Sequence, residues 1–204
     1  MTGAAYPYVE AGTALPEITT GTRATGWWGM VWLCVTEAML FACLIASYFF
    51  LRGSINGFYA EGGHYPSLTL PLPMTAILLA SSATMWWGER GIRRGDQRRL
   101  RIGLALTFAL GVVFLVLQSI EFRHNPLGPT VSAYHSIFYT TTGLHGAHVA
   151  MGLLMNLYVQ LQAWRGHFTA KRHLAIQNVS LYWHFVDAVW IVILTCLYLS
   201  PRLW

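Results

Sequence analysis

The chain has 204 residues, of which 55% are hydrophobic and only 10% are charged. Because a typical soluble domain has about 25% charged residues, this composition excludes an ordinary soluble protein and indicates an integral membrane protein. The net charge is +5. A nucleic-acid partner would need a soluble basic face, which this chain lacks, so that class of partner is excluded. It agrees instead with positively charged loops that contact anionic lipid.

Long apolar runs predict five transmembrane helices. The polar N-terminal tail, residues 1–25, lacks a basic start followed by an apolar run, so no cleavable signal peptide is expected. The predicted helices cover residues 26–52, 70–88, 100–122, 133–164 and 177–199, and loops rich in glycine, proline or charge separate them. The expected fold is an all-α membrane bundle formed by residues 26–204.

Lysine and arginine are distributed unequally between the two ends of this bundle. One end carries ten of them, on the tail, the second loop and the fourth loop: Arg23, Arg90, Arg93, Arg94, Arg98, Arg99, Arg101, Arg165, Lys171 and Arg172. The other end carries Arg52, Arg123 and Arg202. Because positive residues stay on the cytoplasmic side, the N-terminus is predicted to be cytoplasmic and the C-terminus to be outside.

Three cysteines, Cys34, Cys43 and Cys196, lie within predicted helices. They show neither CxxC nor CxxCH spacing, so the sequence encodes neither a structural zinc site nor covalent c-type haem. We interpret them as small apolar side chains.

Ionisable residues inside the predicted helices are few, and each is costly in lipid. They are Glu37, Glu121, His135, His145, His148, His184 and Asp187. At 1.5 Å per residue, Glu37, His145 and Asp187 each lie about 15 Å from the end of their helix. The similar depth predicts a buried polar network shared by three helices, in which His145 and His148, like His184 and Asp187, lie three residues apart on one face.

This network has three interpretations. The side chains can serve as hydrogen-bond partners between helices, which is the commonest role of such groups. They can hold a metal or haem, although "HGAH" supplies only two histidines without matched further ligands. They can relay protons, with Glu37 as the best candidate. Small residues around His145 and His148, in "TTGLHGAHVAMG", place their helix at the centre of the bundle.

A second polar pair ends the third predicted helix. Gln118 and Glu121 lie three residues apart in "LQSIEF". We expect them to form an interfacial pair bonded to the following loop or to a partner.

Four segments in order, "TEAMLFACLIASYFFLR", "LQSIEF", "YHSIFYTTTGLHGAHVAMGLL" and "LYWHFVDAVWIVILTCLYL", resemble subunit III of haem–copper terminal oxidases. The resemblance covers residues 27–199. It implies a non-catalytic subunit that binds neither haem nor copper, since subunits I and II carry those groups. Subunit I reduces oxygen to water and pumps protons, while subunit III stabilises subunit I during turnover and supports proton uptake from the cytoplasm.

The resemblance also assigns the polar residues. Glu37 matches the membrane-embedded glutamate of the family, and His145 and His148 match its "HGxHV" motif. His184 and Asp187 match its "WHFVD" motif, and Glu121 matches the glutamate that ends the preceding helix. The resemblance thus favours a structural and proton-environment role for these residues, with no metal, cofactor or catalytic residue in this chain.

One difference concerns the number of helices. The larger family form has seven, and phospholipids bind in a cleft between its first two helices and the rest. The five-helix form resembles that of bacterial quinol oxidases and several bacterial cytochrome c oxidases. The expected setting is a bacterial plasma membrane, with subunits I and II, structural phospholipids and further small subunits or a respiratory supercomplex as partners. An accessory subunit of a nitric oxide reductase and a haem-binding membrane cytochrome are the alternatives.

Overall fold

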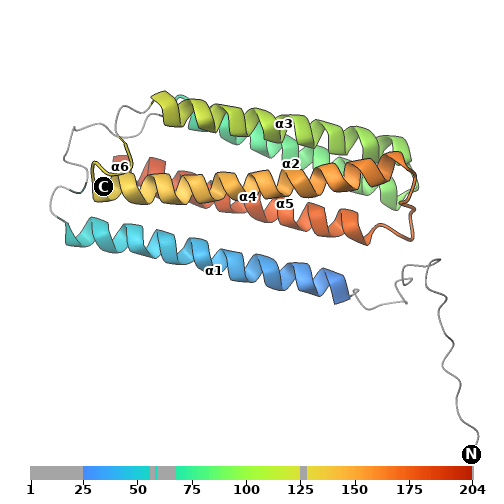
Figure 1. Ribbon diagram of the computed structural model, residues 1–204, viewed down its shortest axis with the longest axis horizontal. Coiled ribbons are helices and arrows are strands. Elements are labelled where there is room, and N and C mark those ends of the chain that lie inside the picture. Colours follow the sequence, from blue (N-terminus) through green and yellow to red (C-terminus); the bar gives the residue numbers. More distant parts are fainter. Residues whose placement is uncertain (1–24, 56–57, 59–67, 125–127, 204) are drawn as a thin grey trace, which may run out of the picture.

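The computed structural model describes residues 25–55, 58, 68–124 and 128–203. The predicted tail up to residue 24 lies outside the described residues. The elements are α1 (Thr25–Ser54), α2 (Pro71–Arg93), α3 (Gln97–His124), α4 (Ala133–Trp164), α5 (Leu174–Ile193), the π-helix η1 (Leu194–Leu199) and the short α6 (Ser200–Leu203) (Figure 1). The described part of the chain contains no β-strand, so the prediction of an all-α bundle with five long helices is confirmed.

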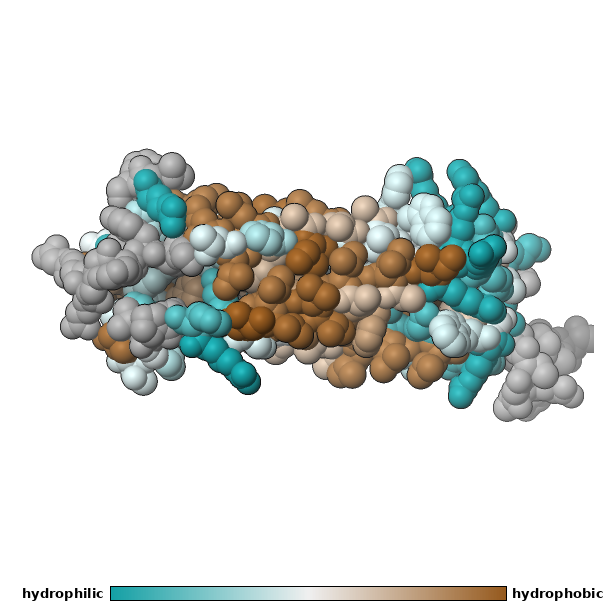
Figure 2. Space-filling model, turned by 90° about the horizontal axis from the view of Figure 1, so that it is seen from above, coloured by the Kyte–Doolittle hydropathy of each residue, from teal (hydrophilic) through white to brown (hydrophobic). Residues whose placement is uncertain are grey.

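The surface of the bundle is that of a membrane protein. Figure 2 shows an apolar band between two polar ends. Among the described residues, three helical stretches, Thr25–Ser54, Gln97–His124 and Leu174–Arg202, are long and apolar enough to cross a membrane by length and composition. The helices α2 and α4, of 23 and 32 residues, run alongside them in the same bundle (Figure 1). We call the end that holds the α2–α3 and α4–α5 turns the arginine-rich end.

The loop between α2 and α3 is shorter than the sequence predicts. We expected α2 to end at residue 88 and α3 to begin at residue 100, whereas the helices reach Arg93 and Gln97. An ion pair from Arg93 to Glu89 one turn earlier extends α2 past its apolar run. The turn itself needs only three residues, because Gly95 has a φ of +79°, which glycine adopts without steric cost.

The helices α2 and α3 pack at backbone contact. A Cβ atom added to Gly103 would lie 2.7 Å from the Cα atom of Gly88, so a side chain at either position would push the helices apart. Further along the bundle, Trp183 of α5 is fully buried, and Cβ atoms added to Gly111 of α3 or Gly152 of α4 would meet its ring. Small residues therefore bring α3, α4 and α5 together around one indole.

The helix α1 lies at the edge of the bundle, apart from the α2–α3 pair (Figure 1). It packs mainly against α5 and α4. Its buried residues are only Cys34, Phe41 and Tyr48, which are spaced seven apart and form one narrow stripe. The remaining faces of α1 are exposed in this chain, and they include Trp32, Met39 and Phe50.

Candidate functional site

The first part of the site joins α1 to α4 in the middle of the bundle. Nε2 of His148 lies 3.0 Å from Oε2 of Glu37, and Nδ1 of the same ring lies 2.8 Å from the Leu144 carbonyl oxygen. The ring of Phe41 packs edge-on against His148, with centroids 5.1 Å apart. Tyr182 of α5 donates a hydrogen bond to the His148 carbonyl oxygen at 3.2 Å. Three helices thus fix the position of this imidazole.

The partners of His148 determine how many protons the pair holds. A carbonyl oxygen can only accept, so Nδ1 of His148 must carry a proton. A neutral ring would then turn the lone pair of Nε2 toward Glu37, and a carboxylate at 3.0 Å would repel it. The contact therefore requires one further proton, either on Glu37 or on Nε2. The Glu37–His148 contact thus joins α1 to α4 by a polar bond inside the membrane-spanning part of the bundle.

His145 lies one turn away and has different surroundings. It is fully buried, and neither ring nitrogen has a hydrogen-bond partner within the described residues. Its neighbours are aromatic: the ring centroids of Trp190 and Phe114 lie 5.1 and 5.9 Å from its own. The structure thus brings His148, but not His145, to Glu37, and His145 belongs to the aromatic core.

A series of polar contacts joins α2 to α5. Oγ of Ser82 lies 2.6 Å from Nδ1 of His184, while Oδ2 of Asp187 lies 3.9 Å from the same nitrogen, which is too long for a hydrogen bond. Both carboxylate oxygens of Asp187 are buried without a partner in the described part of the chain. The expected single network of Glu37, His145, His148, His184 and Asp187 is therefore divided. His184 and Asp187 lie at the α2–α5 contact, whereas Glu37 pairs, among the described residues, with His148 alone.

Three further pairs extend this α2–α5 contact along both helices. The indoles of Trp183 and Trp190 donate to Ser81 and Thr75, at 3.0 and 2.9 Å. Ser180 donates to Oε2 of Glu89 at 2.6 Å. The spacing of Thr75, Ser82 and Glu89 by seven residues would have indicated one face of α2, but the apolar composition of the segment concealed the pattern.

Gln118 and Glu121 bond to neighbouring helices of this chain, whereas we expected them to bond to the following loop or to a partner. Nε2 of Gln118 donates to the Thr142 carbonyl oxygen of α4 at 2.6 Å. A Cβ atom at Gly146 would lie 2.7 Å from Oε1 of Gln118, so this glycine makes room for the amide. Glu121 accepts a hydrogen bond from the Tyr198 hydroxyl at 3.0 Å. Both residues thus act inside the bundle.

Sequence reasoning missed the aromatic hydroxyls at this end of the bundle. Tyr134 donates to the Leu197 carbonyl oxygen at 3.2 Å, within η1. Nη1 of Arg52 donates to Oγ of Ser200 at 2.6 Å and ties the end of α1 to α6. A π-helical turn such as η1 leaves no hydropathy signal, because it changes the hydrogen-bond register and not the composition.

Metal ligands do not converge in the described residues: no group of three or more histidine, cysteine, aspartate or glutamate side chains is placed to hold a metal ion.

The Glu37–His148 contact predicts energetic coupling between the two residues. In a double-mutant cycle, Glu37→Ala and His148→Ala should be non-additive by about 0.5–2 kcal/mol in the stability of the detergent-purified protein, because the second change removes a bond that is already lost. The control is the cycle of Glu37→Ala with His145→Ala, which makes no bond to Glu37 and should be additive. Equal coupling in the two cycles would contradict the pairing.

Comparison with known proteins identifies the family of this chain. Residues 9–202 match the family model described as "Cytochrome c oxidase subunit III". Cytochrome c oxidase subunit 3 of Synechocystis is 37% identical over 175 residues, which are 84% of this chain and 74% of the relative.

Two further bacterial relatives have the same name. Cytochrome c oxidase subunit 3 of Thermostichus vulcanus is 35% identical over 175 residues, covering 85% of this chain and 87% of the relative. That of Corynebacterium diphtheriae is 41% identical over 167 residues, covering 79% and 82%. The chain belongs to the cytochrome c oxidase subunit III family.

Proposed function

We propose that this chain is the non-catalytic subunit III of a proton-pumping haem–copper oxidase in a bacterial plasma membrane. It packs against subunit I, stabilises it while oxygen is reduced to water, and supports proton uptake from the cytoplasm. Membership of the family supports this assignment, and the names of the relatives favour cytochrome c over quinol as the electron donor. Nine of the twelve lysine and arginine residues in the described part of the chain lie at the arginine-rich end, which supports a cytoplasmic N-terminus.

The Glu37–His148 pair carries the proposal for proton uptake. It holds one exchangeable proton in the middle of the bundle, and 29% of the Glu37 side chain is exposed, against 14% of the His148 side chain. The carboxyl group is therefore open to the surface of the chain, while the imidazole behind it is fixed by its bonds. Such a pair can hold a proton close to a partner subunit without taking part in electron transfer.

Glu37→Gln tests this role in the intact complex. The amide of glutamine cannot hold the proton. At acidic pH the oxygen-consumption rate of the variant should match that of the wild type. As the pH rises and protons become scarce, the rate of the variant should begin to fall at a lower pH than the rate of the wild type. The measurement is a pH profile of oxygen consumption by the purified complex. The matched control is Glu121→Gln near the end of α3, which should leave the profile unchanged. Identical profiles for Glu37→Gln and the wild type would contradict the role in proton uptake.

Copurification tests the identity of the complex. A tagged form of this chain should bring down a haem- and copper-containing catalytic subunit that consumes oxygen, and removal of the chain should shorten the active lifetime of that subunit during turnover. Capture of a nitric oxide reductase would overturn the oxidase assignment. A strong Soret band from stoichiometric haem in the isolated chain would overturn the non-catalytic assignment.

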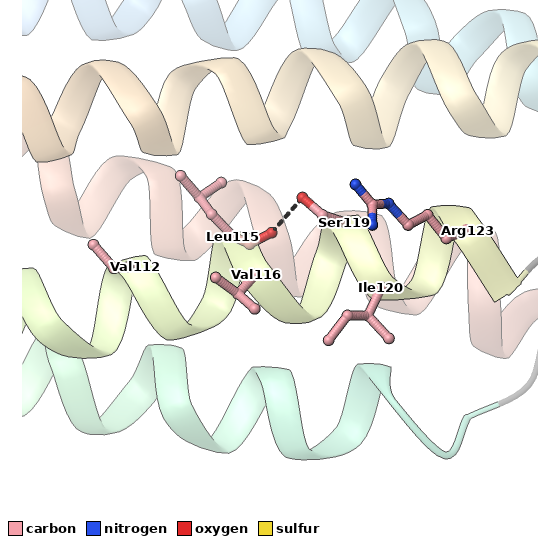
Figure 3. Close-up of a pocket in the computed structure, with 6 residues that line it drawn as sticks. All are labelled: Val112, Leu115, Val116, Ser119, Ile120 and Arg123. Carbon is pink, nitrogen blue, oxygen red and sulfur yellow. Dashed lines mark hydrogen bonds between the residues drawn. The ribbon is translucent and has the colours of Figure 1, made fainter.

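Structural phospholipid is the remaining part of the proposal, and a groove on α3 supports it. The groove has a volume of about 320 Å³, and its lining residues follow one stripe of the helix: Val112, Leu115, Val116, Ser119, Ile120 and Arg123 (Figure 3). Ser119 satisfies its hydroxyl on the Leu115 carbonyl oxygen, which leaves an apolar floor. Arg123 forms no hydrogen bond or ion pair with the described part of the chain. A cation above an apolar groove suits a phosphate headgroup above an acyl chain.

Arg123→Gln should lower the amount of anionic phospholipid that stays bound to the purified complex, since the amide keeps the size but removes the charge. Native mass spectrometry after addition of phosphatidylglycerol measures this amount. Arg98→Gln, at the arginine-rich end and outside the groove, is the control. Equal retention by the two variants would show that lipid covers the surface without using this arginine.

A further inference from the structure

His184 is a partly exposed polar residue at the depth where exposure to lipid costs most. It lies ten residues from the start of α5, or about 15 Å, and its partner Ser82 lies eleven residues, or about 16 Å, from each end of α2. The side chain of His184 is 37% exposed, whereas that of Asp187, one turn later, is 6% exposed. An imidazole edge on the outer surface at mid-membrane would face hydrocarbon, which offers it no hydrogen bond.

The chain itself leaves this edge unsatisfied. Ser82 occupies Nδ1 of His184, and no described residue forms a hydrogen bond with Nε2. The other polar pairs of the α2–α5 contact differ, because Trp183, Trp190 and Ser180 each donate their one N–H or O–H to a side chain of α2, whereas the imidazole has a second nitrogen. The contact thus holds the two helices together through these pairs and turns one nitrogen of His184 outward.

The surroundings of His184 suit an incoming helix. On the same side of α2, Leu79 and Trp86 lie three residues before and four after Ser82 and are 50% and 49% exposed. On α5, Ala188 and Ile191 follow His184 by four and seven residues and are exposed. An alanine beside an exposed polar group lets a neighbouring helix approach closely enough to bond to it. We call the surface of Leu79, Trp86, His184, Ala188 and Ile191 the His184 face.

We propose that the His184 face receives a transmembrane helix of the catalytic subunit, and that this helix presents a hydroxyl, amide or carboxyl side chain to Nε2 of His184. The proposal rests on the proposed function, because it needs an oxidase catalytic subunit as the partner. Complementarity selects a protein helix over lipid: acyl chains carry no hydrogen-bonding group, and phosphate headgroups lie about 15 Å away at the ends of the helices. The carboxyl of Asp187 lies behind the histidine and is buried, with Oδ2 3.9 Å from Nδ1 of His184.

Crosslinking in the complete complex tests the face without altering His184. The photoreactive residue p-benzoyl-phenylalanine, placed at position 188, should crosslink to the catalytic subunit. A crosslink to a second copy of this chain, to another subunit or only to lipid would overturn the proposal. The complex is isolated before crosslinking, so the two proposals can fail separately. If this chain copurifies with the catalytic subunit but crosslinks elsewhere, only this inference is overturned. If it does not copurify with the catalytic subunit, the proposed function is overturned.

Substitution tests the hydrogen bond itself. His184→Phe keeps the ring but removes both nitrogens, and it should speed dissociation of this subunit from the complex in detergent by roughly twofold to tenfold. His184→Gln can still bond and should restore part of the retention. His124→Phe, an exposed histidine at the end of α3, is the matched control and should behave as the wild type. If His184→Phe lowers assembly before washing, the crosslink from position 188 decides. Unchanged dissociation of fully assembled His184→Phe would contradict the proposal.

Discussion

The arrangement of this bundle depends on one constraint: within the membrane, a polar side chain finds its partner in protein or not at all. The helices α2 and α5 meet the constraint by placing hydroxyls of α2 opposite indoles of α5, as with Ser81 and Trp183. The helices α1 and α4 meet it with the Glu37–His148 pair. Each helix contact in the described core therefore contains a polar bond as well as apolar packing, which fixes the register of the helices and not only their proximity.

The depth of a polar residue in the membrane could be predicted from its position in the sequence. The direction in which its side chain leaves the helix was harder to predict. Counting residues placed Glu37, His145 and Asp187 at similar depth and His148 one turn from His145, and Glu37 is in contact with His148. The same count placed His145 in that network, where it does not belong. Residues three apart on a helix differ by about 60° in direction, so His148 faces α1 while His145 faces the aromatic core. His184 and Asp187 diverge in the same way, one toward the surface and the other inward.

Helix ends were predicted less accurately than helix centres, for a related reason. Hydropathy marks where the apolar run stops, whereas a helix continues as long as its backbone bonds and side-chain pairs permit. The extension of α2 to Arg93 follows from its pairing with Glu89, which a hydropathy profile counts only as two charges. The family resemblance assigned residues to the motifs "HGAHV" and "WHFVD", and the structure places the members of each motif in different environments.

The position of the proton-holding pair has a mechanical consequence. Glu37 belongs to α1, which contributes only a narrow buried stripe to the bundle, while His148 belongs to the well-packed α4. The 3.0 Å contact between them therefore joins the most loosely packed helix to one at the centre. Because a hydrogen bond weakens steeply with distance and angle, the geometry of this contact depends on how α1 is held against the bundle. Packing of a partner against the exposed faces of α1 and the geometry of the Glu37–His148 contact are thus linked through the placement of one helix.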